Sequence, residues 1–271
     1  MEQVEFPALL LRFNTPYVAF NFFNIKVTWQ VLIVVVGVII ALVLANKSKE
    51  NYYVRFKDLM EVAPLTALVG FVCARLVYVL FRLTPYLEEP IKFVKIDDGG
   101  FEVLGGIIGG ILIIAKLCKF YDLTKKDVLD YIAPFFALIQ VFASVGIMFN
   151  IKNYGLLTDD ALLRIKGMVY GRTVEMYGLF AYEFILTLII FIVTRIRQKK
   201  RVFQGEIFHL YMLMYGLGRF YIEGLRQDPM LIGGFNAGKL ICFAMVIDAI
   251  VFLGIGWVRK LNSPKKNLIK K

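Results

Sequence analysis

Residues 215–228 read Tyr215-Gly216-Leu217-Gly218-Arg219-Phe220-Tyr221-Ile222-Glu223-Gly224-Leu225-Arg226-Gln227-Asp228 and close an apolar run that starts near Ile207. Arg219, Glu223 and Arg226 are spaced by four and three residues, so on a helix they share one face. A charge at the centre of a bilayer-spanning helix costs about 2.5–3.5 kcal/mol on insertion scales. Three charges on one face therefore indicate a face turned toward protein or water.

This charged face carries two arginines and one glutamate, which leaves a net positive charge. Such a face suits an anionic group such as a phosphate, because guanidinium groups bind oxyanions through paired hydrogen bonds. The alternative is structural: Arg219 pairs with Glu223, and Arg226 extends its charge to the surface. We favour the polar site, because charged residues inside membrane helices are functional more often than not.

The composition places the face in a membrane protein. Of 271 residues, 59% are hydrophobic, the mean hydropathy is +0.67, and the apolar residues come in long blocks. Since about 20 apolar residues span a bilayer as a helix, the chain is predicted to be an all-α polytopic bundle of seven transmembrane helices. The predicted spans are residues 27–46, 62–82, 103–120, 128–149, 177–194, 206–226 and 239–257.

The remaining segments complete the predicted domain organisation. Residues 1–26 are aromatic but broken by Pro7 and Pro16, which indicates an interfacial segment. The 150–176 segment is predicted to be an external loop or a small surface subdomain. Together, residues 1–258 are interpreted as one membrane domain, and residues 259–271 as a basic cytoplasmic tail.

Lysine and arginine gather at four places, which with seven spans all fall on one side of the membrane. These are the segments 47–57, 116–126, 195–201 and the C-terminal tail from Arg259. Basic loops remain in the cytoplasm, so the N-terminus is predicted to lie outside and the C-terminus inside. The formal net charge of +11 is then explained by orientation and by anionic lipid, and no nucleic-acid partner is predicted.

Metal and disulfide chemistry have little support in the sequence. His209 is the only histidine, and Cys73, Cys118 and Cys242 lie in or beside apolar runs without CxxC spacing. No metal or cofactor is therefore predicted. The pairs Gly105/Gly109 and Gly106/Gly110 have GxxxG spacing, which indicates close helix packing or room for a lipid headgroup.

From Trp29 to the last apolar helix, the chain resembles bacterial prolipoprotein diacylglyceryl transferases. The matching segments are Ala74-Arg75-Leu76-Val77-Tyr78-Val79-Leu80-Phe81, Asp98-Gly99-Gly100 with Gly105-Gly106, Asp130-Tyr131-Ile132-Ala133-Pro134, Gly146 with Asn150 and Tyr154-Gly155, and Tyr215-Gly216 through Arg219, Glu223 and Arg226-Gln227. Such enzymes move diacylglyceryl from phosphatidylglycerol to the lipobox cysteine thiol of a lipoprotein signal peptide. The resemblance implies these two partners and a place in the bacterial cytoplasmic (inner) membrane.

The resemblance also implies site residues. The candidate catalytic residues are Arg226, Arg219, Glu223 and Tyr215. The candidate lipid-binding residues are Arg75, Gly105, Gly106, Ser144, Asn150 and Gly155. Cationic groups would assist departure of the phosphate, and a further group must take the thiol proton.

Several positions depart from the family pattern, and two of them remove side chains that the chemistry would use. The family's histidine is Leu104 here, which cannot carry a proton, and its arginine is Ser144, which cannot hold a phosphate by charge. One hypothesis is an active enzyme in which Glu175, Glu183 or Tyr215 replaces the proton acceptor. The other is a degenerate relative that binds phospholipid or lipoprotein precursor without chemistry. A transporter fits less well, because no inverted repeat is visible.

Overall fold

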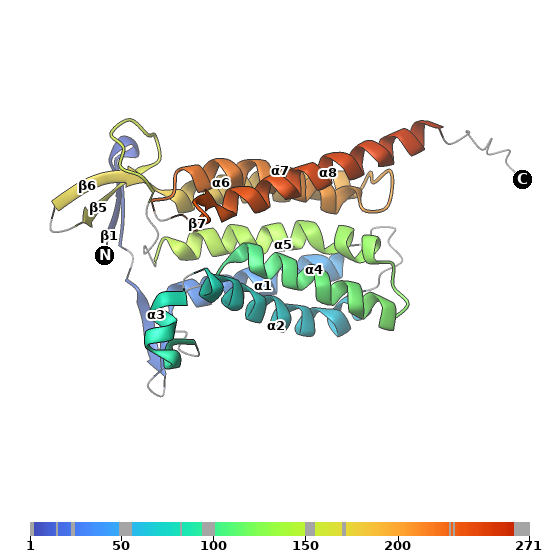
Figure 1. Ribbon diagram of the computed structural model, residues 1–271, viewed down its shortest axis with the longest axis horizontal. Helices are drawn as coiled ribbons and strands as arrows, with labels where there is room; N and C mark the ends of the chain where they lie inside the picture. Colours follow the sequence, from blue (N-terminus) through green and yellow to red (C-terminus); the bar gives the residue numbers. More distant parts are fainter. Residues whose placement is uncertain are drawn as a thin grey trace, which may run out of the picture.

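Seven long helices run along one axis of the molecule, with a small sheet at one end (Figure 1). The computed structural model describes residues 3–14, 16–22, 25–48, 56–81, 83–93, 101–149, 155–169, 172–227, 229 and 231–262. Within these residues the helices of at least 18 residues are α1 (Trp29–Lys47), α2 (Phe56–Leu80), α4 (Val103–Phe120), α5 (Lys125–Ile147), α6 (Leu179–Gln198), α7 (Glu206–Gly224) and α8 (Ala237–Asn262). Each of them overlaps a predicted span.

Five of the helices are long and apolar enough to cross a membrane: α1, α2 from Met60 onward, α5, α6 and α8. This confirms the helical membrane class. The count of seven spans and the orientation of the termini stay predictions.

Helix α5 is the centre of the bundle. It packs against α1, α4, α6 and α7, while α2 pairs with α4 and α7 pairs with α8. Figure 1 shows α6, α7 and α8 on one side of α5, and α1, α2 and α4 on the other. In the most apolar stretch of α5, 56% of the residues are buried, against 17% in the corresponding stretches of α1, α2 and α8. The outer helices therefore leave wide apolar faces, as lipid contact requires.

Glycines of α4 allow its close contact with α2. A Cβ at Gly109 would lie 2.5 Å from the Cβ of Cys73, and one at Gly105 would lie 2.7 Å from the Cβ of Val77. Any side chain at these two positions would force the helices apart. The GxxxG spacing therefore serves helix packing.

The sheet joins two segments that are far apart in sequence. Its order is β2 (Leu11–Asn14), β1 (Gln3–Phe6), β5 (Arg164–Val169), β6 (Arg172–Tyr177), and all pairs are antiparallel. Shorter elements are η1 (Pro7–Leu9), β3 (Val18–Phe22), β4 (Ile25–Thr28), α3 (Leu83–Glu88), η2 (Pro90–Phe93), β7 (Leu231–Ile232) and β8 (Phe235–Asn236).

The sequence did not predict these strands, and the interfacial position of residues 1–26 stays a prediction. Val4 and Phe6 of β1 pack on Ile165 and Met176 of the β5–β6 hairpin, so a small core of their own stabilises the strands. The 150–176 segment contributes that hairpin, and its residues 150–154 lie outside the described part. The division into a membrane domain and a basic tail remains a prediction, and residues 263–271 of the tail are not described.

The helix order also places the basic segments. Residues 47–48, 56–57, 116–126 and 195–201 and the C-terminal end of α8 lie at the end of the bundle opposite the sheet (Figure 1). The described basic residues thus gather at one end of the bundle, and their place on the cytoplasmic side stays a prediction.

Candidate functional site

Five charged side chains meet near the C-terminal end of α7, at the end of the bundle where the sheet lies. We call Glu102, Glu183, Arg219, Glu223 and Arg226 the glutamate–arginine cluster. Arg219 contacts Glu183 through Nη1, and its Nη2 lies 3.6 Å from Glu223 Oε2 and 4.0 Å from Glu102 Oε1. Arg226 Nη1 lies 3.5 Å from Glu223 Oε1 and 3.8 Å from Glu102 Oε2. The predicted charged face of α7 is thus the centre of a cluster.

Three helices and one loop position these side chains. Glu102 is the N-cap residue of α4, and its backbone N–H donates to Ala74 O of α2 at 3.0 Å. Glu183 lies in the second turn of α6. Room for Glu223 depends on Gly238 of α8, because a Cβ there would lie 2.7 Å from Glu223 Cδ.

The charge balance corrects the expectation from the sequence. The face of Arg219, Glu223 and Arg226 has the predicted two guanidinium groups and one carboxylate. Glu102 and Glu183 add two carboxylates, so the whole cluster has three carboxylates against two guanidinium groups and is not net positive. Glu102 and Glu223 are 4% and 3% exposed, and Arg219 is 8% exposed. Buried charges need partners, and here α4 and α6 supply the additional ones.

One polar atom of the cluster is not satisfied. Arg219 Nε is buried and has no hydrogen-bond partner among the described residues. A buried donor without an acceptor costs about 1–3 kcal/mol, so this N–H offers a binding position to an acceptor oxygen of a ligand.

Arg75 is next to the cluster, because Glu102 bonds to the backbone of Ala74, the residue that precedes Arg75. Its guanidinium carbon is 5.5 Å from the ring centroids of both Tyr86 and Phe101, and Phe101 directly precedes Glu102. Aromatic rings hold a cation in place by their quadrupoles. Arg75 therefore remains a candidate for headgroup binding.

Tyr215 belongs to the core more than to the cluster. It is 4% exposed, and its ring stacks on Tyr211 with the centroids 5.6 Å apart. Both residues belong to the buried apolar core that also contains Leu104. Its predicted catalytic role stays a prediction.

The candidate lipid-binding residues divide into two groups. Gly155 lies beside the cluster, because its backbone bridges to Arg226 and the next amide, of Leu156, donates to Leu225 O at 2.8 Å. Gly105 and Gly106 pack against α2, and the buried Ser144 hydroxyl donates to Gln140 O of its own helix at 2.9 Å. Asn150 lies outside the described residues. Lipid binding by these residues is untested and stays a prediction.

The sequence missed Glu102 and named Glu183 only as a possible proton acceptor. The sequence did contain a signal: Glu102 directly precedes the glycine-rich apolar run. An acidic side chain buried at the start of an apolar helix needs a cation nearby. Glu175, the other carboxylate considered for that role, instead pairs with Arg164 at 2.5 Å within the β5–β6 hairpin.

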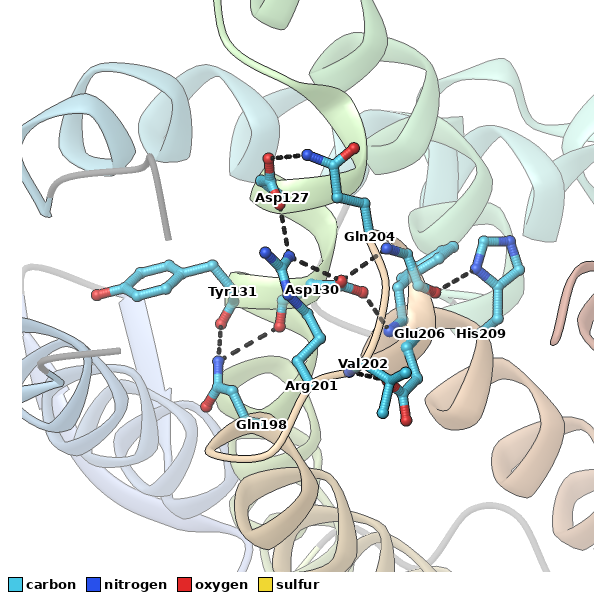
Figure 2. Close-up of polar contacts among 11 residues, drawn as sticks. Asp127, Asp130, Tyr131, Gln198, Arg201, Val202, Gln204, Glu206 and His209 are labelled. Carbon is cyan, nitrogen blue, oxygen red and sulfur yellow. Dashed lines mark hydrogen bonds and ion pairs between the residues drawn. The ribbon is translucent and has the colours of Figure 1, made fainter. Parts of the chain in front are cut away.

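A second cluster of charge lies at the other end of α7 (Figure 2). We call it the aspartate–arginine network, and its side chains are those of Asp127, Asp130, Arg201 and Gln204. Arg201 Nη1 donates to Asp127 Oδ1 at 2.5 Å and to Asp130 Oδ2 at 3.1 Å, and Gln204 Nε2 donates to Asp127 Oδ2 at 3.0 Å.

Asp130 also caps the first turn of α7. It accepts from the backbone N–H of Gly205 at 2.7 Å and from that of Phe208 at 2.9 Å. His209 follows in the same turn, where it bonds to Gly205 O at 2.6 Å and stacks on Phe252 of α8. This network therefore holds the α6–α7 connection against α5. His209 lies at this N-terminal end of α7, away from the glutamate–arginine cluster.

Comparison with known proteins now identifies the family. A family model described as prolipoprotein diacylglyceryl transferase matches residues 17–255. A phosphatidylglycerol–prolipoprotein diacylglyceryl transferase of Clostridium novyi (strain NT) is 30% identical over 93% of this chain and 98% of its own length. Proteins of the same name from Clostridioides difficile (strain 630) and Staphylococcus aureus (strain MSSA476) are each 30% identical over 86% of this chain, and over 92% and 86% of their own lengths. The resemblance seen in the sequence is confirmed, and the chain belongs to the prolipoprotein diacylglyceryl transferase family.

Proposed function

We propose that this chain is an active transferase in the cytoplasmic membrane of a bacterium, moving diacylglyceryl from phosphatidylglycerol to the lipobox cysteine thiol of a lipoprotein precursor. In this reaction a sulfur–carbon bond forms at the glyceryl carbon. The bond from that carbon to the phosphate oxygen breaks, and glycerol phosphate leaves with the electron pair. Negative charge thus collects on the phosphate, where cationic donors lower the barrier most.

The observation that carries the proposal is the pair of arginines formed by Arg219, which is buried on α7, and Arg226, which follows the C-terminal end of that helix. Arg219 and Arg226 make four of their five ion contacts at 3.5–4.0 Å, longer than a good charge-assisted hydrogen bond. Arg219 Nε is in addition without an acceptor among the described residues. Arg219 Nη1 stays hydrogen-bonded to Glu183. Arg219 Nε, Arg219 Nη2 and Arg226 Nη1 can bind a phosphate without breaking a short hydrogen bond.

The test uses the purified full chain in vesicles of phosphatidylglycerol with a synthetic lipobox peptide. We expect the diacylglyceryl peptide as product, no product from a peptide with serine in place of the cysteine, and loss of product with Arg226→Ala. Vesicles without phosphatidylglycerol serve as the lipid control. Absence of product from the wild-type chain under these conditions would contradict the proposal.

A second candidate is a relative that binds the lipid or the precursor without chemistry. It is favoured by Leu104, which is 2% exposed in the apolar core, and by Ser144, whose hydroxyl is used within its own helix. Under this hypothesis the wild-type chain binds phosphatidylglycerol, Arg226→Ala weakens that binding, and neither protein forms product. The same vesicles therefore separate the two functions.

A further inference from the structure

We propose that Glu102 accepts the proton of the incoming cysteine thiol, an inference that rests on the proposed transferase function. The thiolate is the nucleophile in sulfur chemistry. The site therefore needs a group that takes the proton beside the arginines that bind the phosphate.

Other groups near the arginines are less suited to this role. Leu104 has no proton-accepting atom, and Tyr215 lies in the same apolar core. Glu183 is in the closest contact with Arg219. Glu223 is held between both arginines, at 3.6 Å and 3.5 Å. These two carboxylates are already committed to orienting the guanidinium groups.

Glu102 is bound more loosely than either. Its two oxygens lie 4.0 Å from Arg219 and 3.8 Å from Arg226, beyond hydrogen-bond distance, and its side chain makes no capping hydrogen bond to α4. Its backbone, in contrast, is anchored to Ala74 O of α2. The carboxylate is thus fixed in place while its lone pairs remain available to a proton.

The position of Glu102 couples proton transfer to phosphate binding. Each of its oxygens faces a different arginine, so a phosphate bound by both guanidinium groups lies against this carboxylate. The phosphate competes with Glu102 for the two cations. That competition releases the carboxylate for the thiol.

The thiol proton moves to a Glu102 oxygen, and the sulfur electron pair forms the bond to the glyceryl carbon. The bond from that carbon to oxygen breaks, and its electron pair leaves on the phosphate. Glu102 then passes the proton to water or to the departing phosphate and regains its charge.

The experiment compares Glu102→Gln with the wild type on two peptides, one with cysteine and one with selenocysteine in the lipobox. Glutamine keeps the shape but accepts no proton, so transfer to cysteine should fall by about 10²–10⁴-fold, the range of general-base catalysis. A selenol ionises more readily than a thiol and brings its nucleophile already deprotonated. The selenocysteine peptide should therefore restore most of the lost rate.

Glu206→Gln is the matched control. Glu206 is a buried glutamate at the other end of α7, where it accepts from Arg197 Nε at 2.6 Å and from Val202 N–H at 2.5 Å. The same isosteric change there should leave the rate per folded molecule and the ratio between the peptides unchanged. Phosphatidylglycerol binding and the thermal midpoint are measured for every variant.

The outcomes separate the two proposals. If the wild type makes no product with either peptide, the proposed function fails. If the wild type is active and Glu102→Gln keeps its rate, or loses it equally with both peptides, only the role of Glu102 is overturned. Should Glu102→Gln not fold, Glu102→Asp replaces it, because its carboxylate is one methylene shorter. The ratio of selenocysteine to cysteine rates must then rise at least about tenfold above that of the wild type.

Discussion

The glutamate–arginine cluster and the aspartate–arginine network lie at opposite ends of α7 and solve the problem of buried charge differently. In the aspartate–arginine network, hydrogen bonds of 2.5–3.1 Å satisfy the carboxylates of Asp127 and Asp130, two of them from backbone amides. In the glutamate–arginine cluster, four of five ion contacts measure 3.5–4.0 Å, and Arg219 Nε has no acceptor in the described part of the chain.

This difference separates a structural device from a candidate site. Backbone donors are fixed by the helix, so the aspartate–arginine network cannot exchange its partners without unwinding the first turn of α7. Side-chain ion pairs at long distance can rearrange around a ligand. Charge that is buried but loosely bound is therefore the feature to test for function. Four substitutions, one of them with a matched control, test the difference between the two ends of α7.

The largest effect is expected from Asp130→Ala. This change leaves Arg201 with one partner fewer and two amides of α7 without their acceptor. Breaking a buried ion pair costs about 3–5 kcal/mol, so the free energy of unfolding should fall by that amount. Chemical unfolding in detergent micelles measures it. Transfer per folded molecule should persist, and its loss at normal stability would place Asp130 in the chemistry.

Arg219→Gln should act mainly on the reaction. Removing one donor to a developing anion lowers rates by about 10²–10³-fold, and transfer to the lipobox peptide should fall within this range. Arg201→Gln is the matched control, since it makes the same change in the aspartate–arginine network. It should lower the thermal midpoint but not the rate per folded molecule. Equal rate losses in both variants would erase the distinction between the two ends.

Gly105→Ala tests how precisely α4 must present Glu102. The new Cβ would lie 2.7 Å from Val77 Cβ and 2.8 Å from Cys73 O, and the second of these is backbone that cannot turn away. Overpacking of this kind costs about 1–3 kcal/mol. The thermal midpoint should fall, and the transfer rate should fall with it as α4 shifts. An unchanged midpoint would show that α2 and α4 can separate freely.

Ser48→Ala should have the smallest effect. The Ser48 hydroxyl accepts from Arg195 Nη2 at 2.8 Å and donates to Leu44 O at 2.9 Å, at the end of α1 away from the sheet. Arg195 keeps its bond to Gln198, so the loss should be about 0.5–1.5 kcal/mol. Thermal unfolding measures it, and the transfer rate should not change. A larger loss of unfolding free energy would show that the contact between Ser48 and Arg195 is part of the structural network at this end of the bundle.

The length of the apolar blocks and the spacing of the charged residues were enough to predict most of the fold and the central residues of the site. Long apolar blocks gave the helices, because the bilayer thickness sets their length, and the four- and three-residue spacing placed Arg219, Glu223 and Arg226 together. The strands of residues 3–28 were missed. They are short, and what stabilises β1 is its pairing with β5, about 160 residues farther along the chain.

The sequence by itself determined the family, the membrane class, the approximate ends of seven long helices and the helix that carries the charged face. The partners of that face were decided only by tertiary structure. Glu102 and Glu183 neutralise the arginines from α4 and α6, and no spacing along the chain relates these residues to α7. Electrostatic energy depends on distance through space, and that distance is set by how the helices pack.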